Sequence, residues 1–266
     1  MTDPVLDIRG VTKEFPRHGA LPLRAVDNAS LRVEVGKCVA LVGESGSGKS
    51  TLARIALQLI KPDAGDVLLD GTSLSALSPS ALRVARLAMQ PVFQDPAAAF
   101  NPRRTVRAIL RQALAQVPGA EISDEKLASL LERVELRPGA DYLDRYPHQL
   151  SGGQRQRLAL GRAIATQPKV IIADEPLSGA DVSIRAQLLN LMTALQRESG
   201  VAYLLVTHDM LVARAFSDRV SVMYRGRIVE EGPTDCVLGA PRHDYTRALL
   251  SAVQSLSSLS DVSMTM

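Results

Sequence analysis

The chain has 266 residues, a length that can bury one large hydrophobic core or a main domain with a smaller lobe. Hydrophobic residues make up 46% and charged residues 22%, which excludes a chain that is disordered overall. Aromatic residues make up 3%, Trp is absent and the formal net charge is +3, so we expect no nucleic-acid partner.

The first ten residues carry charged side chains where a signal peptide needs an apolar stretch. No run of about 18 apolar residues, the length that spans a bilayer, occurs anywhere in the sequence. Two distant cysteines, Cys38 and Cys236, lack the spacing of a metal or redox site. We therefore expect a soluble, cytoplasmic chain that reaches a membrane only through protein partners.

Alternation of apolar and polar residues at 6–11 and 25–35 predicts two antiparallel strands, with Gly36-Lys37 as the turn between them. The continuous apolar run 38–42 predicts a buried strand that ends in a Gly-rich loop. From Lys49 to Leu59 the apolar spacing is helical, and another strand is expected at 66–70.

From residue 101 to about 147 the pattern becomes helical, with Pro-Gly pairs between the stretches. The expected elements are helices at 106–117, 124–136, 154–165 and 182–198, and strands at 169–173, 201–206 and 219–224. This alternation predicts an α/β fold with a mostly parallel sheet, an antiparallel β subdomain and an inserted α-helical subdomain at about 97–165. Residues 254–266 are expected to form a loose C-terminal tail.

A phosphate-binding motif, GxxxxGK[ST], lies between the buried strand and the following helix. Its residues are Gly43, Glu44, Ser45, Gly46, Ser47, Gly48, Lys49 and Ser50. Glycines let the backbone wrap around phosphate, and the helix N-terminus presents unpaired N–H groups. We expect Lys49 to reach the β- and γ-phosphates, Ser50 to ligate Mg²⁺ and Thr51 to contact the α-phosphate. The alternative is a Gly-rich turn without a ligand.

A later apolar run ends in Asp174 and Glu175, at the sheet edge where the phosphate loop is also expected. Because successive side chains on a strand point oppositely, we expect Asp174 to hold Mg²⁺ and Glu175 to be the general base for water. The alternative is a surface turn. His208 follows another apolar strand and is expected to contact the γ-phosphate or orient the attacking water, although lone histidines are more often structural.

A second helix opens on Leu150-Ser151-Gly152-Gly153-Gln154, which is either a helix cap or a second phosphate-binding N-terminus. With this sequence between the phosphate loop and the acidic strand, the chain resembles the ABC (ATP-binding cassette) ATPase family over roughly residues 6–253. The resemblance implies a P-loop NTPase (RecA-like) fold, with one ABC ATPase domain over 1–253. It also implies a head-to-tail dimer in which this signature of one subunit closes over ATP held by the other.

Other residues gain roles from the resemblance. Gln94 matches the family's glutamine loop, which implies contact with Mg²⁺ and a link to the helical lobe. Phe15 falls where relatives place an aromatic that stacks on adenine, and a core Phe is the alternative. Asp181 closes the segment 178–181, which reads Ser-Gly-Ala-Asp where relatives usually carry Ser-Ala-Leu-Asp in a loop that contacts the opposite subunit.

The expected site residues fall into three groups, which are catalytic, nucleotide-binding and metal-binding. The expected catalytic residues are Glu175, His208, Lys49 and Gln94. The expected nucleotide-binding residues are Phe15, Gly43, Glu44, Ser45, Gly46, Ser47, Gly48, Lys49, Ser50, Thr51, Gln94, Ser151, Gly152, Gly153, Gln154 and Asp181. The expected metal ligands are Ser50, Gln94 and Asp174, and the expected cofactors are ATP and Mg²⁺.

Finer motifs look like the peptide/nickel importer branch of the family. They are Phe93-Gln94-Asp95-Pro96, Asn101-Pro102-Arg103, the segments 146–157 and 226–233, and the C-terminal segment 241–250. In the last segment Tyr245, Leu249 and Val253 would line one helix face, which packing against the core explains.

This resemblance implies an ATP-hydrolysing subunit of an ABC importer for peptides, nickel or a related small solute. Its partners would be a second ATPase, identical or different, two transmembrane permease subunits seated near residues 94–100, and indirectly an extracytoplasmic solute-binding protein. The chain would lie on the cytoplasmic face of the inner membrane.

Two alternatives stay open. A non-transport ABC ATPase of DNA repair or translation is disfavoured because about 56 residues separate Gln94 from Leu150, too few for a long coiled-coil arm, and because there is one phosphate loop. A non-hydrolysing regulatory module is disfavoured by the presence of Glu175 and His208.

Overall fold

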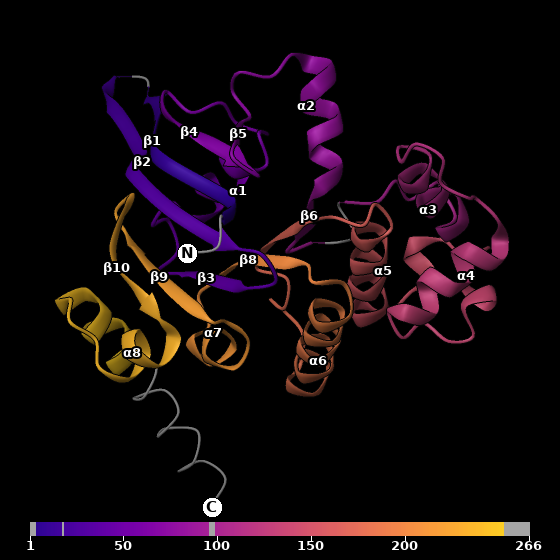
Figure 1. Ribbon diagram of the computed structural model, residues 1–266. Helices are drawn as coiled ribbons and strands as arrows, with labels where there is room; N and C mark the ends of the chain where they lie inside the picture. The colour runs from indigo at the N-terminus through magenta and orange to yellow at the C-terminus, as the bar shows by residue number, and fades with distance from the viewer. Residues whose placement is uncertain (1–3, 18, 96–98, 253–266) are drawn as a thin grey trace, which may run out of the picture. The chain divides into compact units, whose positions relative to one another are not determined.

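The computed structural model describes residues 4–17, 19–95 and 99–252 (Figure 1). These residues fall into two compact units. The first unit joins the two ends of the chain, Met1–Ser75 and Leu204–Met266, and the second is Ala76–Tyr203. The predicted tail at 254–266 and Val253 lie outside the described residues. In the described parts of the chain, no helix is both long and apolar enough to cross a bilayer.

The first unit contains a four-stranded sheet in the order β2-β1-β4-β5. Its strands are β1 (Pro4–Arg17), β2 (Ala20–Glu34), β4 (Ala64–Leu69) and β5 (Thr72–Ser73). The first two strands pair antiparallel, as predicted, and alternate residues such as Leu6 and Ile8 are fully buried. The predicted turn between them was wrong: the chain turns at Gly19, whose φ is +70°, and the turn at residues 35–36 leads on to the next strand.

A second set of strands in the first unit follows the order β10-β9-β3-β8. They are β3 (Cys38–Val42), β8 (Ala202–Thr207, which begins in the second unit), β9 (Arg219–Tyr224) and β10 (Arg227–Pro233). Strand β3 pairs parallel with β9, and β9 pairs antiparallel with β10. Every residue of β3 and β8 is buried, which explains their continuous apolar sequences.

Three labelled helices belong to the first unit. They are α1 (Lys49–Ala56), α7 (Met210–Phe216) and α8 (Thr234–Gly239). Helix α1 is shorter than predicted, because Gln58 adopts a left-handed φ of +56° just after it. Leu59 therefore lies beyond the helix and is 55% exposed instead of packing on its buried face. Residues 244–252 form a further helix at the end of the described chain.

The second unit holds two parallel strands and five labelled α-helices. The strands are β6 (Met89–Phe93) and β7 (Val170–Asp174). The helices are α2 (Pro79–Ala85), α3 (Val106–Leu114), α4 (Asp124–Arg133), α5 (Gly152–Ile164) and α6 (Val182–Ser199). Helix α5 packs against α3, α4 and α6, and three of these four helices fall within residues 97–165. The exact bounds of a helical insertion there remain a prediction.

Side-chain caps fix where the main helices of the second unit begin. Thr105, Ser123, Ser151 and Asp181 each accept a hydrogen bond from the backbone N–H three residues later. A cap satisfies one of the N–H groups that a helix start leaves unpaired. The predicted starts therefore agree with the structure to within two residues, whereas α3 and α4 end three residues earlier than their apolar patterns suggested.

Candidate functional site

The phosphate loop joins β3 to α1, and the side chain of Lys49 forms hydrogen bonds with the loop's own backbone. The Lys49 side chain is 6% exposed, and its Nζ donates hydrogen bonds to the carbonyl oxygens of Gly43 at 2.7 Å and Glu44 at 2.8 Å. These are charge-assisted bonds, which are stronger than bonds between neutral groups. The loop therefore holds a positive charge at its centre while residues 44–46 stay exposed.

Two glycines lie where the loop approaches other backbone closely. Gly43 has φ +151° and Gly48 φ +108°, and a Cβ on either would lie 2.2 Å from a carbonyl oxygen, that of Met223 or of Ala25. The structure thus explains both glycines by close approach as well as by backbone conformation. A wrapped backbone with a central ammonium fits a phosphate ligand.

Two contacts from far along the chain hold the loop. The backbone N–H of Gly226 donates to the Ser47 carbonyl oxygen at 2.8 Å. The backbone N–H of Glu44 donates to the Tyr245 hydroxyl at 3.0 Å. The sequence predicts core packing for Tyr245 and does not reveal this bond, because no local pattern connects residues 201 positions apart.

The acidic pair lies at the end of β7. Asp174 is the last strand residue and is 7% exposed. Glu175 is half-buried and has a left-handed φ of +51°. Strand alternation therefore does not reach Glu175, and that part of the reasoning for its orientation was wrong. Left-handed non-glycine residues cost about 1–3 kcal/mol and cluster at functional sites, so the general-base role stays a prediction with a different geometric basis.

His208 directly follows the last residue of β8 and is exposed. Its neighbour Asp209 caps α7, since its Oδ1 accepts hydrogen bonds from the N–H groups of Leu211 at 2.9 Å and Val212 at 3.2 Å. The cap fixes the backbone next to the histidine. His208 is thus displayed at a strand end, as the sequence predicted, and its contact with phosphate or water remains a prediction.

In the second unit, a cavity of about 380 Å³ gathers several predicted residues at the start of α5. They are Gln94, Ser151, Gly152, Gly153 and Asp181. Gln94 Nε2 donates to Ser178 Oγ at 3.2 Å, so the glutamine loop and the segment before α6 meet here. The Asp181 carboxylate also accepts from the Ile184 N–H at 2.8 Å, which makes it the cap of α6.

The helix start in this cavity is a capping box. The Ser151 hydroxyl accepts from the Gln154 N–H at 3.2 Å, and Gln154 Oε1 accepts from the Ser151 N–H at 2.9 Å. Gln154 is absent from the residues that line the cavity, because its side chain also turns toward the Tyr142 hydroxyl at 3.4 Å. Helix α5 therefore has a side-chain cap, and Gly152 and Gly153 at its start still line the cavity. The capping role does not exclude phosphate binding at this helix start.

Phe15 lies on β1 in the first unit, opposite Leu23 of β2. Its side chain is half-buried, and Lys13 Nζ lies 5.7 Å from the ring centroid. Leu23 is 42% exposed, so this end of the sheet presents apolar side chains to solvent. Such a partly open ring is compatible with stacking on a base, and the adenine contact remains a prediction.

The predicted Mg²⁺ ligands supply a hydroxyl, an amide and a carboxylate, from Ser50, Gln94 and Asp174. Oxygen donors of these types suit Mg²⁺. Ser50 belongs to the first unit and the other two to the second. Within the described ranges, no three or more His, Cys, Asp or Glu side chains form a metal cluster. A set with one carboxylate does not depend on such a cluster, so the magnesium site stays a prediction.

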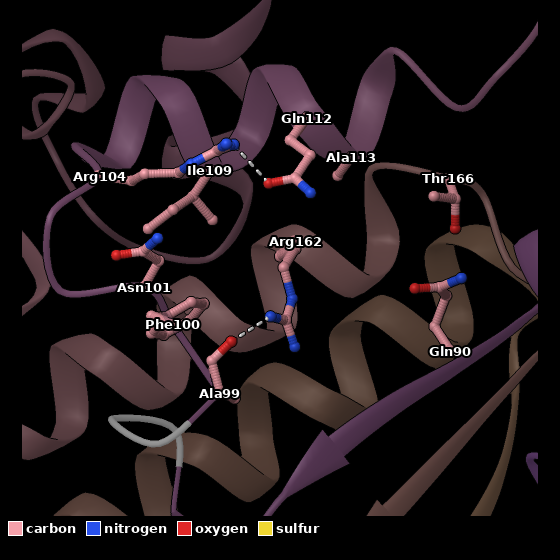
Figure 2. A pocket seen from close by; sticks show the side chains of 10 residues that line it. All are labelled: Gln90, Ala99, Phe100, Asn101, Arg104, Ile109, Gln112, Ala113, Arg162 and Thr166. Atoms are coloured by element: carbon pink, nitrogen blue, oxygen red, sulfur yellow. Dashed lines mark hydrogen bonds between the residues drawn. The ribbon is translucent and has the colours of Figure 1, made fainter. Parts of the chain in front are cut away.

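A second cavity of about 460 Å³ in the second unit lies where α3 and α5 meet (Figure 2). The Arg162 guanidinium donates to the Ala99 carbonyl oxygen at 2.9 Å and lies 5.0 Å from the centroid of the Phe100 ring. Arg104 donates to Gln112 at 2.8 Å. Burial lowers the pKa of Arg162 below its ordinary value. Among the described residues that line the cavity are these two arginines and no carboxylate, a combination that the sequence alone did not predict.

A Gly-rich phosphate loop between a buried strand and a helix of an α/β unit defines a P-loop NTPase. The chain belongs to the ABC transporter family, whose model matches residues 26–178. Among solved structures, it is similar to the ATP-binding cassette MJ0796 in a dimeric post-hydrolysis state bound to ADP and Pi, with a TM-score of 0.76 and 30% identity. That match covers 86% of this chain and 98% of the other. The fold predicted from the sequence is thus confirmed.

A further solved structure and two curated relatives give the same picture. CbiO1 from Clostridium perfringens, part of the ABC transporter complex cbiONQ, matches with a TM-score of 0.76 and 25% identity over 90% of this chain and 92% of the other. The glutathione import ATP-binding protein GsiA is 45% identical over 260 residues in Salmonella paratyphi A and in Escherichia coli K12. Each match covers 94% of this chain but only 41% of the relative.

Proposed function

We propose that the chain binds and hydrolyses ATP as the motor subunit of an import complex. The observation that carries the proposal is the phosphate loop, in which Lys49 lies buried between the Gly43 and Glu44 carbonyls while residues 44–46 are exposed. The importer part draws on the GsiA relatives, which match 94% of this chain. The resemblance in the finer motifs to peptide/nickel importer ATPases supports the same reading.

Each predicted site residue would have a role in ATP binding or hydrolysis that follows from its chemical group. Lys49 and the N–H groups at the start of α1 would bind the phosphates of ATP. Glu175 would accept a proton from the attacking water, and His208 would orient that water or contact the γ-phosphate. Mg²⁺, held by Ser50, Gln94 and Asp174, would neutralise phosphate charge. Phe15 would stack on the adenine.

A second subunit would complete the site. The helix start at Ser151, with Gly152 and Gly153 beside a cavity, is a second place where backbone N–H groups meet open space. In the proposed head-to-tail dimer it covers ATP held by the neighbouring molecule. MJ0796, a cassette to which this chain is similar, was solved as a dimer, which supports the pairing of two cassettes.

The cavity around Arg162 and Phe100 supports a docking site for the permease subunits. Its lining includes Ala99 and Phe100, at the end of the segment 94–100 where the resemblance places those partners, and its arginines would favour an acidic side chain. The chain would then work at the cytoplasmic face of the membrane. For the cargo, the relatives named for glutathione import favour a peptide over nickel, since glutathione is itself a tripeptide.

The test uses the purified chain with magnesium-ATP and two pairs of variants. Lys49→Ala should lose at least about tenfold in ATP affinity, as expected when charge-assisted phosphate contacts are removed. Lys61→Ala, which removes the same charge from an exposed position, is its control. Glu175→Gln should bind ATP like the wild type and lose most hydrolysis, whereas the exposed Glu121→Gln should turn over normally.

Three outcomes would contradict parts of this proposal. Unchanged affinity in Lys49→Ala would show that the loop is not the phosphate site. Normal turnover in Glu175→Gln would remove the general-base assignment. ATP binding without hydrolysis in the wild type, even with membrane partners present, would favour the non-hydrolysing regulatory module.

A further inference from the structure

A side chain far along the sequence supports the phosphate loop. Tyr245, on the last described helix, accepts a hydrogen bond from the Glu44 N–H at 3.0 Å. Glu44 is the second residue of the loop and is exposed. Its carbonyl oxygen accepts hydrogen bonds from Lys49 Nζ at 2.8 Å and from the Ser47 N–H at 3.2 Å, and both of these donors belong to the loop itself. We propose that the Tyr245 hydroxyl is a positioning group for ATP binding, which holds the Glu44 peptide in place; this inference rests on the proposed function.

The need for such a support follows from where Lys49 lies. Its Nζ restrains the start of the loop by bonding to the Gly43 and Glu44 carbonyl oxygens. If Lys49 turns toward phosphates when ATP binds, as proposed above, these carbonyls lose their cationic partner. The bond from the Glu44 N–H to Tyr245 does not involve the lysine, and it keeps this end of the loop in place through that change.

The tyrosine is itself held firmly. Its ring stacks on Tyr224 at the end of β9, with 4.1 Å between the ring centroids. Its backbone N–H donates to His243 Nδ1 at 3.1 Å. The Glu230 carboxylate on β10 accepts from the N–H groups of Arg242 at 2.8 Å and His243 at 3.1 Å, which fixes the approach to the helix.

The same helix is also anchored in the core by two leucines. Leu249 and Leu250 pack against the buried cluster that includes Val220 and Val222. Burial raises the pKa of Tyr245 above its ordinary value, so the hydroxyl is neutral at physiological pH. The ring and the helix therefore present a fixed, uncharged acceptor to the Glu44 N–H.

The experiment separates the hydroxyl from the packing. Tyr245→Phe keeps the ring stack and removes only the hydroxyl, whereas Leu250→Ala weakens the packing of the same helix on the core and keeps the hydroxyl. ATP binding is measured by calorimetry, and kcat and KM by phosphate release, on the full chain with magnesium-ATP. Tyr245→Phe should raise Kd and KM about three- to tenfold, the loss expected for one hydrogen bond, with kcat within about twofold of wild type.

The controls decide between positioning and general stability. Leu250→Ala should lower Tm and leave Kd within about twofold, and Tyr245→Leu should lower both Tm and affinity. The inference is overturned if Tyr245→Phe binds ATP as tightly as the wild type. It is also overturned if Leu250→Ala weakens binding as much as Tyr245→Phe does. A wild-type chain that binds no ATP would instead overturn the proposed function.

Discussion

Gly48 offers the sharpest test of how tightly the phosphate loop is packed. Its φ is +108°, and a Cβ there would lie 2.2 Å from the Ala25 carbonyl oxygen, more than 1 Å inside the ordinary separation of about 3.5 Å. Gly46, two residues earlier, has φ +80°, and a Cβ at that position would meet no neighbouring atom within 4 Å. Gly46→Ala is therefore a matched control that carries the backbone strain without the collision.

The main difference between the two substitutions is the collision with the Ala25 backbone. A left-handed alanine costs about 1–2 kcal/mol at either position. The collision with Ala25 adds about 1–3 kcal/mol in Gly48→Ala only, the usual range for overpacking. At about 2–4 °C for each kcal/mol in a chain of this size, Gly48→Ala should melt about 2–12 °C below Gly46→Ala.

The assay is thermal unfolding of both variants without nucleotide, followed by calorimetric titration with magnesium-ATP. Gly48→Ala should also bind ATP more weakly than Gly46→Ala, because relief of the collision displaces the start of α1. Equal melting temperatures for the two variants would refute the packing of the loop against Ala25.

Two further predictions concern other parts of the chain. The Asp63 carboxylate accepts hydrogen bonds from Lys13 Nζ and the Glu14 N–H, both at 2.7 Å, and these bonds lower its pKa. The stabilisation by this carboxylate is thus complete above the ordinary Asp pKa and is lost as pH falls through the lowered pKa. Asp63→Asn should therefore be less stable than the wild type at pH 7, and the difference in Tm should shrink as pH falls through the lowered pKa; a difference that does not shrink in acid would contradict this. Arg162→Ala should keep the basal hydrolysis of the isolated chain and lose its stimulation by co-expressed permease subunits, while the exposed Arg197→Ala keeps both.

Local patterns were enough to predict the elements that they span. The apolar run of β3 and the helical spacing of α6 are properties of consecutive residues, so burial and periodicity predicted them to within one residue. Helices α2, α7 and α8 have seven residues or fewer, which is too short for periodicity to stand out. Those helices were not predicted.

The features of the site also divide into those that local sequence predicts and those that depend on tertiary packing. The phosphate loop could be recognised because its chemistry requires glycines and a lysine at fixed spacing. The Tyr245 bond to Glu44 and the stacking of Arg162 on Phe100 join residues 201 and 62 positions apart, and they depend on tertiary packing. The left-handed conformation of Glu175 also escaped prediction, since Glu rarely adopts it without support from the surrounding fold.

In the proposed motor, residues 43–50 bind the triphosphate of ATP and residues 151–154 of a neighbouring molecule cover its far side. The most direct measurement is the structure of Glu175→Gln in complex with magnesium-ATP and its partner ATPase. We expect ATP between these two segments, with Ser151 of one subunit facing the γ-phosphate bound by the other. A complex in which the two segments lie on surfaces that never meet would contradict it.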